Sequence, residues 1–320
     1  MFDTSGFNPR LIEKFYRISD ILQKIYTTKY TKKRLSLYGG TALNFLHFKG
    51  IPRLSIDIDF NYRDQQQNDW AQERNEIDTI IKKILHDLHY NNDDIAIQPS
   101  YPLTRFDVGY KTADGGKDSL KIEIGYLRRI PVLSKDILLP FTHLKTGDEF
   151  SVQTPQREEL FGNKFCTFLY RYGDENTASS RDLFDTYTIS RMKLNTTLFD
   201  VAMVIDSLMR KEPRLYDRNP DTIIKNVMID DQLKNLIRNR HVPADIKEKT
   251  QVFITQHLNN SKKKFKTLID TFFDHHRFEP TLLEHHDLLN QHITKHPSIL
   301  WNLKQLEEKK KNVNNMRKKE

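Results

Sequence analysis

Two aspartates separated by one residue carry the clearest chemical signal in the chain. Asp57 and Asp59 alternate with the apolar residues Ile56, Ile58 and Phe60. Successive side chains of a strand point to opposite faces, so both carboxylates lie on one face and the apolar side chains on the other. Carboxylates about 7 Å apart on a strand can share divalent ions, and Mg²⁺ prefers carboxylate, water and phosphate oxygens. The pattern predicts a site for Mg²⁺ or Mn²⁺.

A glycine pair, Gly39-Gly40, precedes these aspartates. It follows a predicted short strand over residues 35–38 and precedes a predicted helix over residues 41–48, whose first residue, Thr41, is also a candidate for nucleotide binding. Backbone without a Cβ atom lets a ligand approach closely, and a helix N-terminus attracts phosphate. The alternative is a surface turn followed by an acidic strand edge. The two features together favour a cradle that binds a nucleoside triphosphate and its metal ions.

Glu123 is the candidate for a third carboxylate. Residues 105–110 and 120–126 both alternate apolar and polar side chains, and the segment between them, Ala-Asp-Gly-Gly-Lys-Asp, predicts a hairpin loop. Glu123 lies on the polar face of the second strand, which could neighbour the strand of the two aspartates. The alternative is a solvated strand face. Three carboxylates that bind two Mg²⁺ ions are the arrangement that nucleotidyl transfer requires.

Composition restricts the class of protein. The chain has 320 residues, a formal net charge of +8 and 37% hydrophobic residues, which suggests one large or two modest domains and a polyanionic partner such as RNA. A single cysteine excludes an internal disulfide and suits a reducing cytoplasm. The N-terminus lacks the features of a signal peptide, and no apolar run reaches the length of a membrane span. We therefore expect a cytoplasmic protein.

The distribution of periodic patterns suggests two domains. We expect an α/β domain with a mixed sheet over residues 1–190, a helical domain over 191–308 and a basic, disordered tail over 309–320. Thr154 and Pro155 predict the N-cap and the first residue of a helix. Beyond residue 190, apolar spacing predicts helices over these ranges: 196–210, 221–238, 244–259, 261–276, 280–293 and 298–312.

The two motifs together carry a resemblance to a known family. Gly-Gly-Thr-Ala-Leu, followed by Pro-Arg-x-Ser-x-Asp-x-Asp-Phe, resembles the opening signature of AbiEii/AbiGii-type nucleotidyltransferase toxins, relatives of the MenT toxins. The resemblance is sharp over residues 36–60 and recognisable again over 119–126 and 158–187. It implies the polymerase-β-like nucleotidyltransferase fold and a helical C-terminal domain.

The later segments imply further site residues. Glu-Glu-Leu-Phe-Gly-Asn-Lys-Phe and Arg-Asp-Leu-Phe-Asp resemble family motifs in which a helical lysine and an aspartate are functional. Lys164 would neutralise triphosphate charge, and Asp182 would orient Lys164 or contact the nucleotide. Asp185, one helical turn later, could be the matching residue instead, or a partner on the helix surface.

Two residues just before the aspartates are candidates for phosphate contacts. If the strand alternation starts at Ser55, this residue shares the face of Asp57 and Asp59 and could hydrogen-bond a phosphate. The alternatives are a target for self-modification or antitoxin-mediated modification, and a simple turn serine. Arg53 is a candidate phosphate clamp, but equally a structural partner of an acidic residue.

The resemblance also implies a reaction and partners. By this resemblance, a Mg²⁺-bound NTP would donate its nucleotide to an RNA acceptor, the 3′ end of a tRNA, and the modification would block translation. A cognate antitoxin is implied, and the basic helical domain would bind the acceptor. The alternatives are transfer to a protein or small-molecule hydroxyl, and a non-catalytic RNA- or protein-binding module on the same scaffold.

Overall fold

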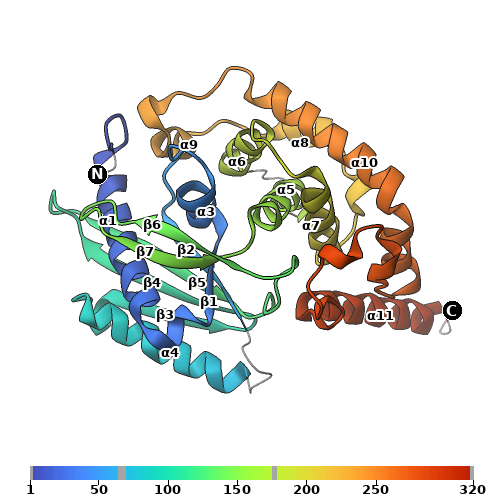
Figure 1. Ribbon diagram of the computed structural model, residues 1–320, viewed down its shortest axis with the longest axis horizontal. Helices are drawn as coiled ribbons and strands as arrows, with labels where there is room; N and C mark the ends of the chain where they lie inside the picture. The colour runs from blue at the N-terminus through green and yellow to red at the C-terminus, as the bar shows by residue number, and fades with distance from the viewer. Residues whose placement is uncertain (1–2, 64–69, 175–178, 318–320) are drawn as a thin grey trace. The chain divides into compact units, whose positions relative to one another are not determined.

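The protein has a mixed α/β fold, as the sequence predicted. The computed structural model describes residues 3–63, 70–174 and 179–317, and Figure 1 shows the course of the chain. A five-stranded sheet has the order β1-β2-β5-β4-β3, in which β2 and β5 are parallel and the other pairs antiparallel; β6 and β7 form a separate hairpin. The strands are β1 (Leu35–Tyr38), β2 (Asp57–Tyr62), β3 (Ile95–Ser100), β4 (Leu103–Lys111), β5 (Lys117–Gly125), β6 (Ile137–Thr142) and β7 (Glu149–Thr154).

Helices make up most of the remaining described chain. The α-helices are α1 (Pro9–Thr27), α2 (Lys29–Lys32), α3 (Gly39–Ala42), α4 (Trp70–Asp87), α5 (Arg157–Asp174), α6 (Ser180–Ser190), α7 (Thr196–Leu208), α8 (Pro220–Asn226), α9 (Asp231–Leu236), α10 (Ile246–His275) and α11 (Pro297–Arg317). A π-helical turn, Leu43–His47, directly follows α3. Among the described helices, none has both the length and the apolar character that crossing a membrane requires.

The chain divides into two compact units whose segments alternate along the sequence. Unit 1 consists of Met1–Arg129, Asp136–Gln156 and Asp230–Val242, and unit 2 of Ile130–Lys135, Arg157–Ile229 and Pro243–Glu320. The functional division near residue 190 stays a prediction, because compact units need not coincide with functional domains.

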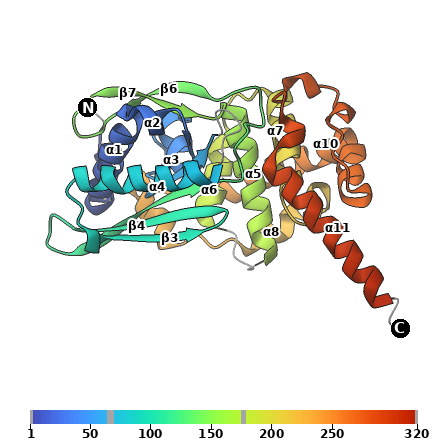
Figure 2. The same ribbon diagram turned by 90° about the horizontal axis from the view of Figure 1, so that it is seen from below.

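In unit 1, helices α1 and α4 cover the apolar face of the five-stranded sheet (Figure 2). Tyr26 of α1 contacts the ring of Phe60 on β2, with the ring centroids 6.2 Å apart. The hydroxyl of Tyr62, also on β2, donates a hydrogen bond to Glu73 of α4. Phe60 and Tyr62 alternate with Asp57, Asp59 and Asn61, so the acidic face of the sheet is the one opposite these two helices.

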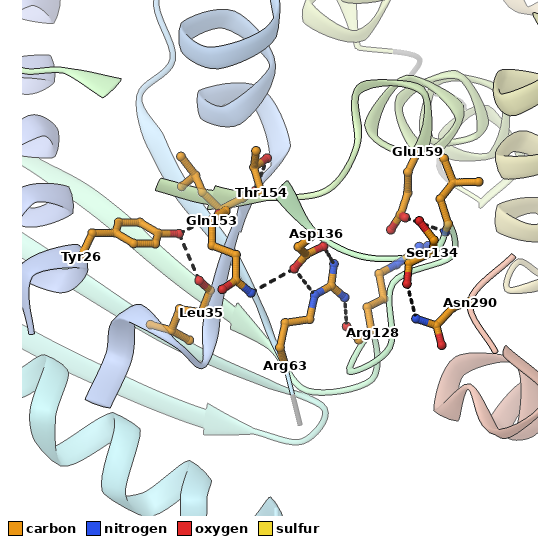
Figure 3. Close-up of polar contacts among 12 residues, drawn as sticks. Tyr26, Leu35, Arg63, Arg128, Ser134, Asp136, Gln153, Thr154, Glu159 and Asn290 are labelled. Atoms are coloured by element: carbon orange, nitrogen blue, oxygen red, sulfur yellow. Dashed lines mark hydrogen bonds and ion pairs between the residues drawn. The ribbon is translucent and has the colours of Figure 1, made fainter. Parts of the chain in front are cut away.

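The β6–β7 hairpin is joined to the edge of the sheet by buried polar contacts (Figure 3). The Tyr26 hydroxyl lies within hydrogen-bonding distance of the carbonyl oxygens of Leu35 and Gln153, at 3.1 and 3.0 Å. Arg63 donates two hydrogen bonds, of 2.8 and 2.9 Å, to the carboxylate of Asp136. Thr154 donates to the carbonyl of Leu37 at 3.0 Å. These contacts fix the strand that leads into Gly39.

Unit 2 is built around an aromatic cluster from three helices. Phe165 of α5, Phe199 of α7 and Phe253 of α10 lie with ring centroids 5.8 to 5.9 Å apart. The buried imidazole of His257 contacts all three rings and lies 2.9 Å from the carboxylate of Asp200. Elsewhere in the unit, the amide of Asn290 donates to the carbonyl of Ser134 and Glu159 accepts from the backbone of Leu133; Figure 3 shows both contacts.

Several expected elements differ from the structure. The patterns at 244–259 and 261–276 form one continuous helix, α10, because the buried Ser261 continues the apolar stripe between them. Residues 280–293 form 3₁₀ turns instead of an α-helix. Residues 221–238 form two short helices, α8 and α9, which are separated at 227–230.

The helix predicted to begin at Pro155 begins at Arg157. Thr154 ends strand β7, and its hydroxyl binds the carbonyl of Leu37 instead of capping the helix. Helix α11 extends through most of the segment 309–320 for which a tail was expected. Residues 318–320, most of the predicted polar loop at 64–70 and part of the predicted loop at 173–180 lie outside the described residues.

Candidate active site

The predicted carboxylates lie on one face of two adjacent parallel strands of unit 1. Asp59 of β2 is directly opposite Glu123 of β5, and Asp57 is directly opposite Lys121. All four side chains are partly exposed, whereas Ile58 and the other residues between them are buried. Glu123 forms neither a hydrogen bond nor an ion pair with another described residue. Its carboxylate therefore remains available to a ligand.

Gly39 makes room for the carboxylate of Asp59. The residue has a φ of +65°, in the left-handed region that side chains disfavour, and it directly follows Tyr38, which pairs with Asp59. A Cβ atom on Gly39 would lie 1.9 Å from the Asp59 Oδ2 atom, which no real contact allows. Only glycine fits between the end of β1 and the acidic side chain. The glycine turn and the aspartate motif thus form one local structure.

Gly40 lies against the two candidate phosphate ligands. A Cβ atom on Gly40 would lie 2.8 Å from Nη2 of Arg53 and 2.9 Å from Oγ of Ser55. Both side chains are buried, with Arg53 3% and Ser55 6% exposed. The Arg53 guanidinium also donates to the carbonyl of Leu54 at 2.9 Å, which indicates that it has at least a structural role.

Thr41 connects the glycine turn to the metal strand. Its side chain is fully buried, and its hydroxyl donates a hydrogen bond to the backbone carbonyl of Asp57. This hydroxyl therefore holds the start of β2 in place. A nucleotide contact from Thr41, as the sequence suggested, stays a prediction.

The donor atoms on this face suit a hard divalent cation. Asp57, Asp59 and Glu123 offer only carboxylate oxygens, the ligands that Mg²⁺ and Mn²⁺ prefer over nitrogen and sulfur. Within the described residues, no group of three or more histidines, cysteines, aspartates and glutamates lies close enough to hold a metal ion. Mg²⁺ is usually held by one or two carboxylates together with water and substrate phosphates, so the residues present fit such an ion with phosphate as a further ligand.

Lys164, Asp182 and Asp185 form a second group of charges, within unit 2. The Lys164 Nζ of α5 lies 2.8 Å from Oδ1 of Asp182 and 3.1 Å from Oδ2 of Asp185, both on α6. Both aspartates are buried, and Asp182 also accepts a hydrogen bond of 2.7 Å from Arg171. The sequence left open which aspartate pairs with Lys164, and the structure pairs the lysine with both.

Sequence reasoning missed a cation that lies beside the carboxylates. Arg105 of β4 is directly opposite Glu123 of β5, and its guanidinium is bound to Asp107. The alternation over residues 105–110 already indicated that Arg105 and Asp107 share a polar face. What the sequence lacked was the pairing of β4 with β5 in this register.

Comparisons with known proteins identify the family of the chain. A protein-family profile described as "Nucleotidyl transferase AbiEii toxin, Type IV TA system" matches residues 20–251. A comparison with curated protein sequences found no significant match.

Two solved structures are similar to the chain. The nucleotidyltransferase toxin MenT4 of Mycobacterium tuberculosis H37Rv has 15% sequence identity and a TM-score of 0.55, over 79% of this chain and 86% of that chain. An antigenic nucleotidyltransferase-like protein of Paracoccidioides brasiliensis has 11% identity and a TM-score of 0.38, over 69% of this chain and 96% of that chain. The first likeness supports the fold.

The family profile spans well over half of the chain, including the glycine turn, the three carboxylates and the Lys164 group. The chain therefore belongs to the AbiEii family of nucleotidyl transferase toxins of type IV toxin–antitoxin systems.

Proposed function

We propose that the protein transfers a nucleotide from an NTP to the 3′ hydroxyl of an RNA, and that this RNA is a tRNA. One observation carries the chemistry: Asp59 lies over Gly39, on the same face as Asp57 and directly opposite Glu123. This arrangement brings hard oxygen ligands next to backbone that a phosphate can approach closely. The choice of RNA as acceptor is supported by the net charge of +8.

In this proposal, Asp57 and Asp59 hold Mg²⁺ or Mn²⁺ together with phosphate oxygens of the NTP, and Glu123, directly opposite Asp59, is the third carboxylate of the face. When bound, the divalent ions neutralise triphosphate charge and favour the ionised form of the attacking hydroxyl. Ser55 and Arg53 lie against Gly40, whereas Asp59 lies against Gly39, and the two residues bind oxygens of the triphosphate.

The proposed reaction exchanges one phosphorus–oxygen bond for another. The acceptor oxygen forms a bond to the α-phosphorus, the bond between this phosphorus and the α–β bridging oxygen breaks, and pyrophosphate leaves. The hydroxyl proton passes to Glu123, which makes no hydrogen bond with another described residue. The chain orients the two reactants, and such positioning supplies a large part of the rate of phosphoryl-transfer enzymes.

Unit 2 would contribute to substrate binding. We propose that the Lys164 ammonium donates to a phosphate oxygen, with Asp182 and Asp185 holding it in place. On α10, Lys262 and Lys263 are exposed, and neither forms an ion pair with another described residue. These two lysines are suited to the phosphate backbone of an acceptor. We include them in the helical acceptor-binding domain proposed for residues 191–308.

The consequence for the cell follows from the acceptor. A nucleotide added to the 3′ end of tRNA would prevent aminoacylation and block translation in the cytoplasm. Membership in a type IV toxin–antitoxin family supports a cognate antitoxin that relieves this block.

The test is to incubate the protein with each α-labelled NTP, Mg²⁺, a tRNA pool and a cell extract that contains protein. We expect label at RNA 3′ ends, identified by 3′-end sequencing, and no incorporation when EDTA is present. Label in protein without label in RNA would overturn the choice of acceptor. A folded protein that incorporates no label, and that does not arrest growth when expressed, would favour a non-catalytic binding module.

A further inference from the structure

A row of polar side chains crosses four strands of the acidic sheet face in unit 1. Asp59 of β2 is opposite Glu123 of β5, Glu123 is opposite Arg105 of β4, and Arg105 is opposite Gln98 of β3. Side chains at paired positions point to the same face. The row therefore places one guanidinium beside the carboxylates, on the far side of Glu123 from Asp59.

Arg105 is held in a fixed orientation by its neighbours. Its Nε and Nη2 atoms donate to Oδ1 of Asp107, at 2.9 and 2.6 Å. Gln98 donates to the other oxygen of Asp107 at 3.2 Å and so fixes that carboxylate in turn. Hydrogen bonding to Asp107 is the largest influence that raises the pKa of Arg105, and the charges of Glu123 and Asp57 raise it further. The guanidinium thus lies in the field of the candidate metal ligands.

One edge of this guanidinium is open. Nη1 has no hydrogen-bond partner among the residues that the structure describes, and the Arg105 side chain is 32% exposed. A guanidinium carries five N–H donors in a rigid fork, which matches the oxygens of a phosphate group. Arg105 is therefore a preoriented cation with donors directed away from its structural partner.

The position of Arg105 distinguishes the two phosphate-bearing substrates. The glycine turn, Ser55 and Arg53 lie at the β1–β2 side of Asp59. Arg105 lies two strands away from Asp59, about 10 Å in the direction of the strand hydrogen bonds. An NTP that uses the glycine turn therefore leaves Arg105 to the other reactant, whose hydroxyl must approach Glu123.

We propose that Arg105 binds a backbone phosphate of the acceptor, next to the attacking hydroxyl. This inference rests on the proposed nucleotidyl transfer, and it specifies the acceptor as a strand with phosphodiester groups. An acceptor on a protein side chain would offer no such anion.

The test compares Arg105→Gln with the wild-type protein in two separate binding measurements. One uses a fluorescent single-stranded RNA with a 3′-deoxy end, so that binding is measured without transfer; the other uses calorimetry with NTP and Mg²⁺. We expect the Kd for RNA to rise about tenfold, as for the loss of one charge-assisted contact, while the Kd for NTP stays unchanged. The slope of log K for RNA association against log salt is negative, and its magnitude should decrease by about 0.7, the value for one phosphate on a single strand.

Two further variants make the result specific. Arg105→Lys keeps the charge but loses the fork, so its RNA affinity should lie between those of the wild type and Arg105→Gln. Arg10→Gln is the matched control, because Arg10 is also an exposed arginine of unit 1 that is paired with an aspartate, Asp114, in the β4–β5 hairpin loop. It should leave both Kd values unchanged.

The failures of the two proposals can be told apart. Wild-type protein that transfers nucleotide to RNA, together with unchanged RNA binding by Arg105→Gln, would overturn the role of Arg105 only. An equal loss of NTP and RNA affinity would also overturn it, because Arg105 would then serve the nucleotide or the fold. Wild-type protein that neither binds RNA nor labels it would overturn both proposals.

Discussion

The acidic sheet face of unit 1 and the Lys164 group of unit 2 use similar residues in opposite ways. On the sheet, Asp59 and Glu123 are like charges in directly opposite positions, and both are partly exposed. In unit 2, Lys164 lies between two buried aspartates that neutralise it. Like charges in opposite positions of a sheet destabilise the fold, and a bound cation relieves their repulsion. Buried charges, in contrast, must be paired within the fold. The first region is arranged for ligands, the second at least for stability.

The largest effect should come from Asp59→Asn. We expect the transfer rate to fall about 10³-fold, because one metal ligand is lost, while the free energy of unfolding changes by no more than about 1 kcal/mol. Single-turnover kinetics and urea denaturation measure the two quantities. Asp114→Asn, at an exposed hairpin turn, is the control that should keep full activity. A strong loss of stability in Asp59→Asn would contradict the comparison.

Asp185→Ala should lower the free energy of unfolding much more than Asp59→Asn does. It removes one of the two carboxylates that neutralise Lys164, and breaking a buried pair costs about 3 to 5 kcal/mol. Urea denaturation measures this cost. The exposed pair Lys234–Asp231, at 3.4 Å, is the control, since Asp231→Ala should cost less than about 1 kcal/mol. Equal costs for the two variants would show that the Lys164 group contributes little to stability.

Gly39→Ala tests whether the glycine turn and Asp59 act as one structure. The new Cβ atom would displace Asp59, so we expect the transfer rate to fall about 10²-fold, as for a misplacement of about 1 Å. Gly50→Ala is a close control, because Gly50 also has a positive φ, +73°, but nothing lies within 4 Å of the added Cβ atom. Both variants should lose some stability from backbone strain. Similar activities in both would show that the collision with Asp59 has no consequence.

The smallest effect is expected from Arg171→Gln. Arg171 binds Asp182 at 2.7 Å, but its side chain is 54% exposed, so solvent screens this ion pair. Thermal denaturation should show that the free energy of unfolding decreases by less than about 1 kcal/mol. A larger decrease would mean that the exposed Arg171–Asp182 pair stabilises the fold as much as the buried Lys164–Asp182 pair does.

Local patterns predicted the parts of the site that short segments determine. The alternation around Asp57 and Asp59, and the hairpin that carries Glu123, needed only neighbouring residues. Strands β3 and β6 were not predicted, because Pro99 and Pro140 lie within them and proline argues against a central strand. Thr154 looked like a helix cap because a threonine followed by proline fits both a cap and a strand end.

Contacts between distant segments could not be derived from the sequence. The register that places Arg105 beside Glu123 depends on the hairpin alignment, since a shift by one residue would move Arg105 to the other face. The backbone bridge between Arg53 and Ile237 joins segments more than 180 residues apart, and nothing in the pattern around either residue indicates it. The pairing of Lys164 with both aspartates likewise required the packing of α5 against α6.

That bridge has a practical consequence for anyone who wishes to divide the molecule. Segment Asp230–Val242 belongs to unit 1, where the backbone of Leu54 donates to Leu236 at 2.8 Å and Phe7 packs with both side chains. A fragment cut after the last strand would lack these residues and would leave the arginine beside the glycine turn without its backbone partner. No single cut of the chain yields both units whole. We therefore expect a fragment made by one cut to lose the toxic activity.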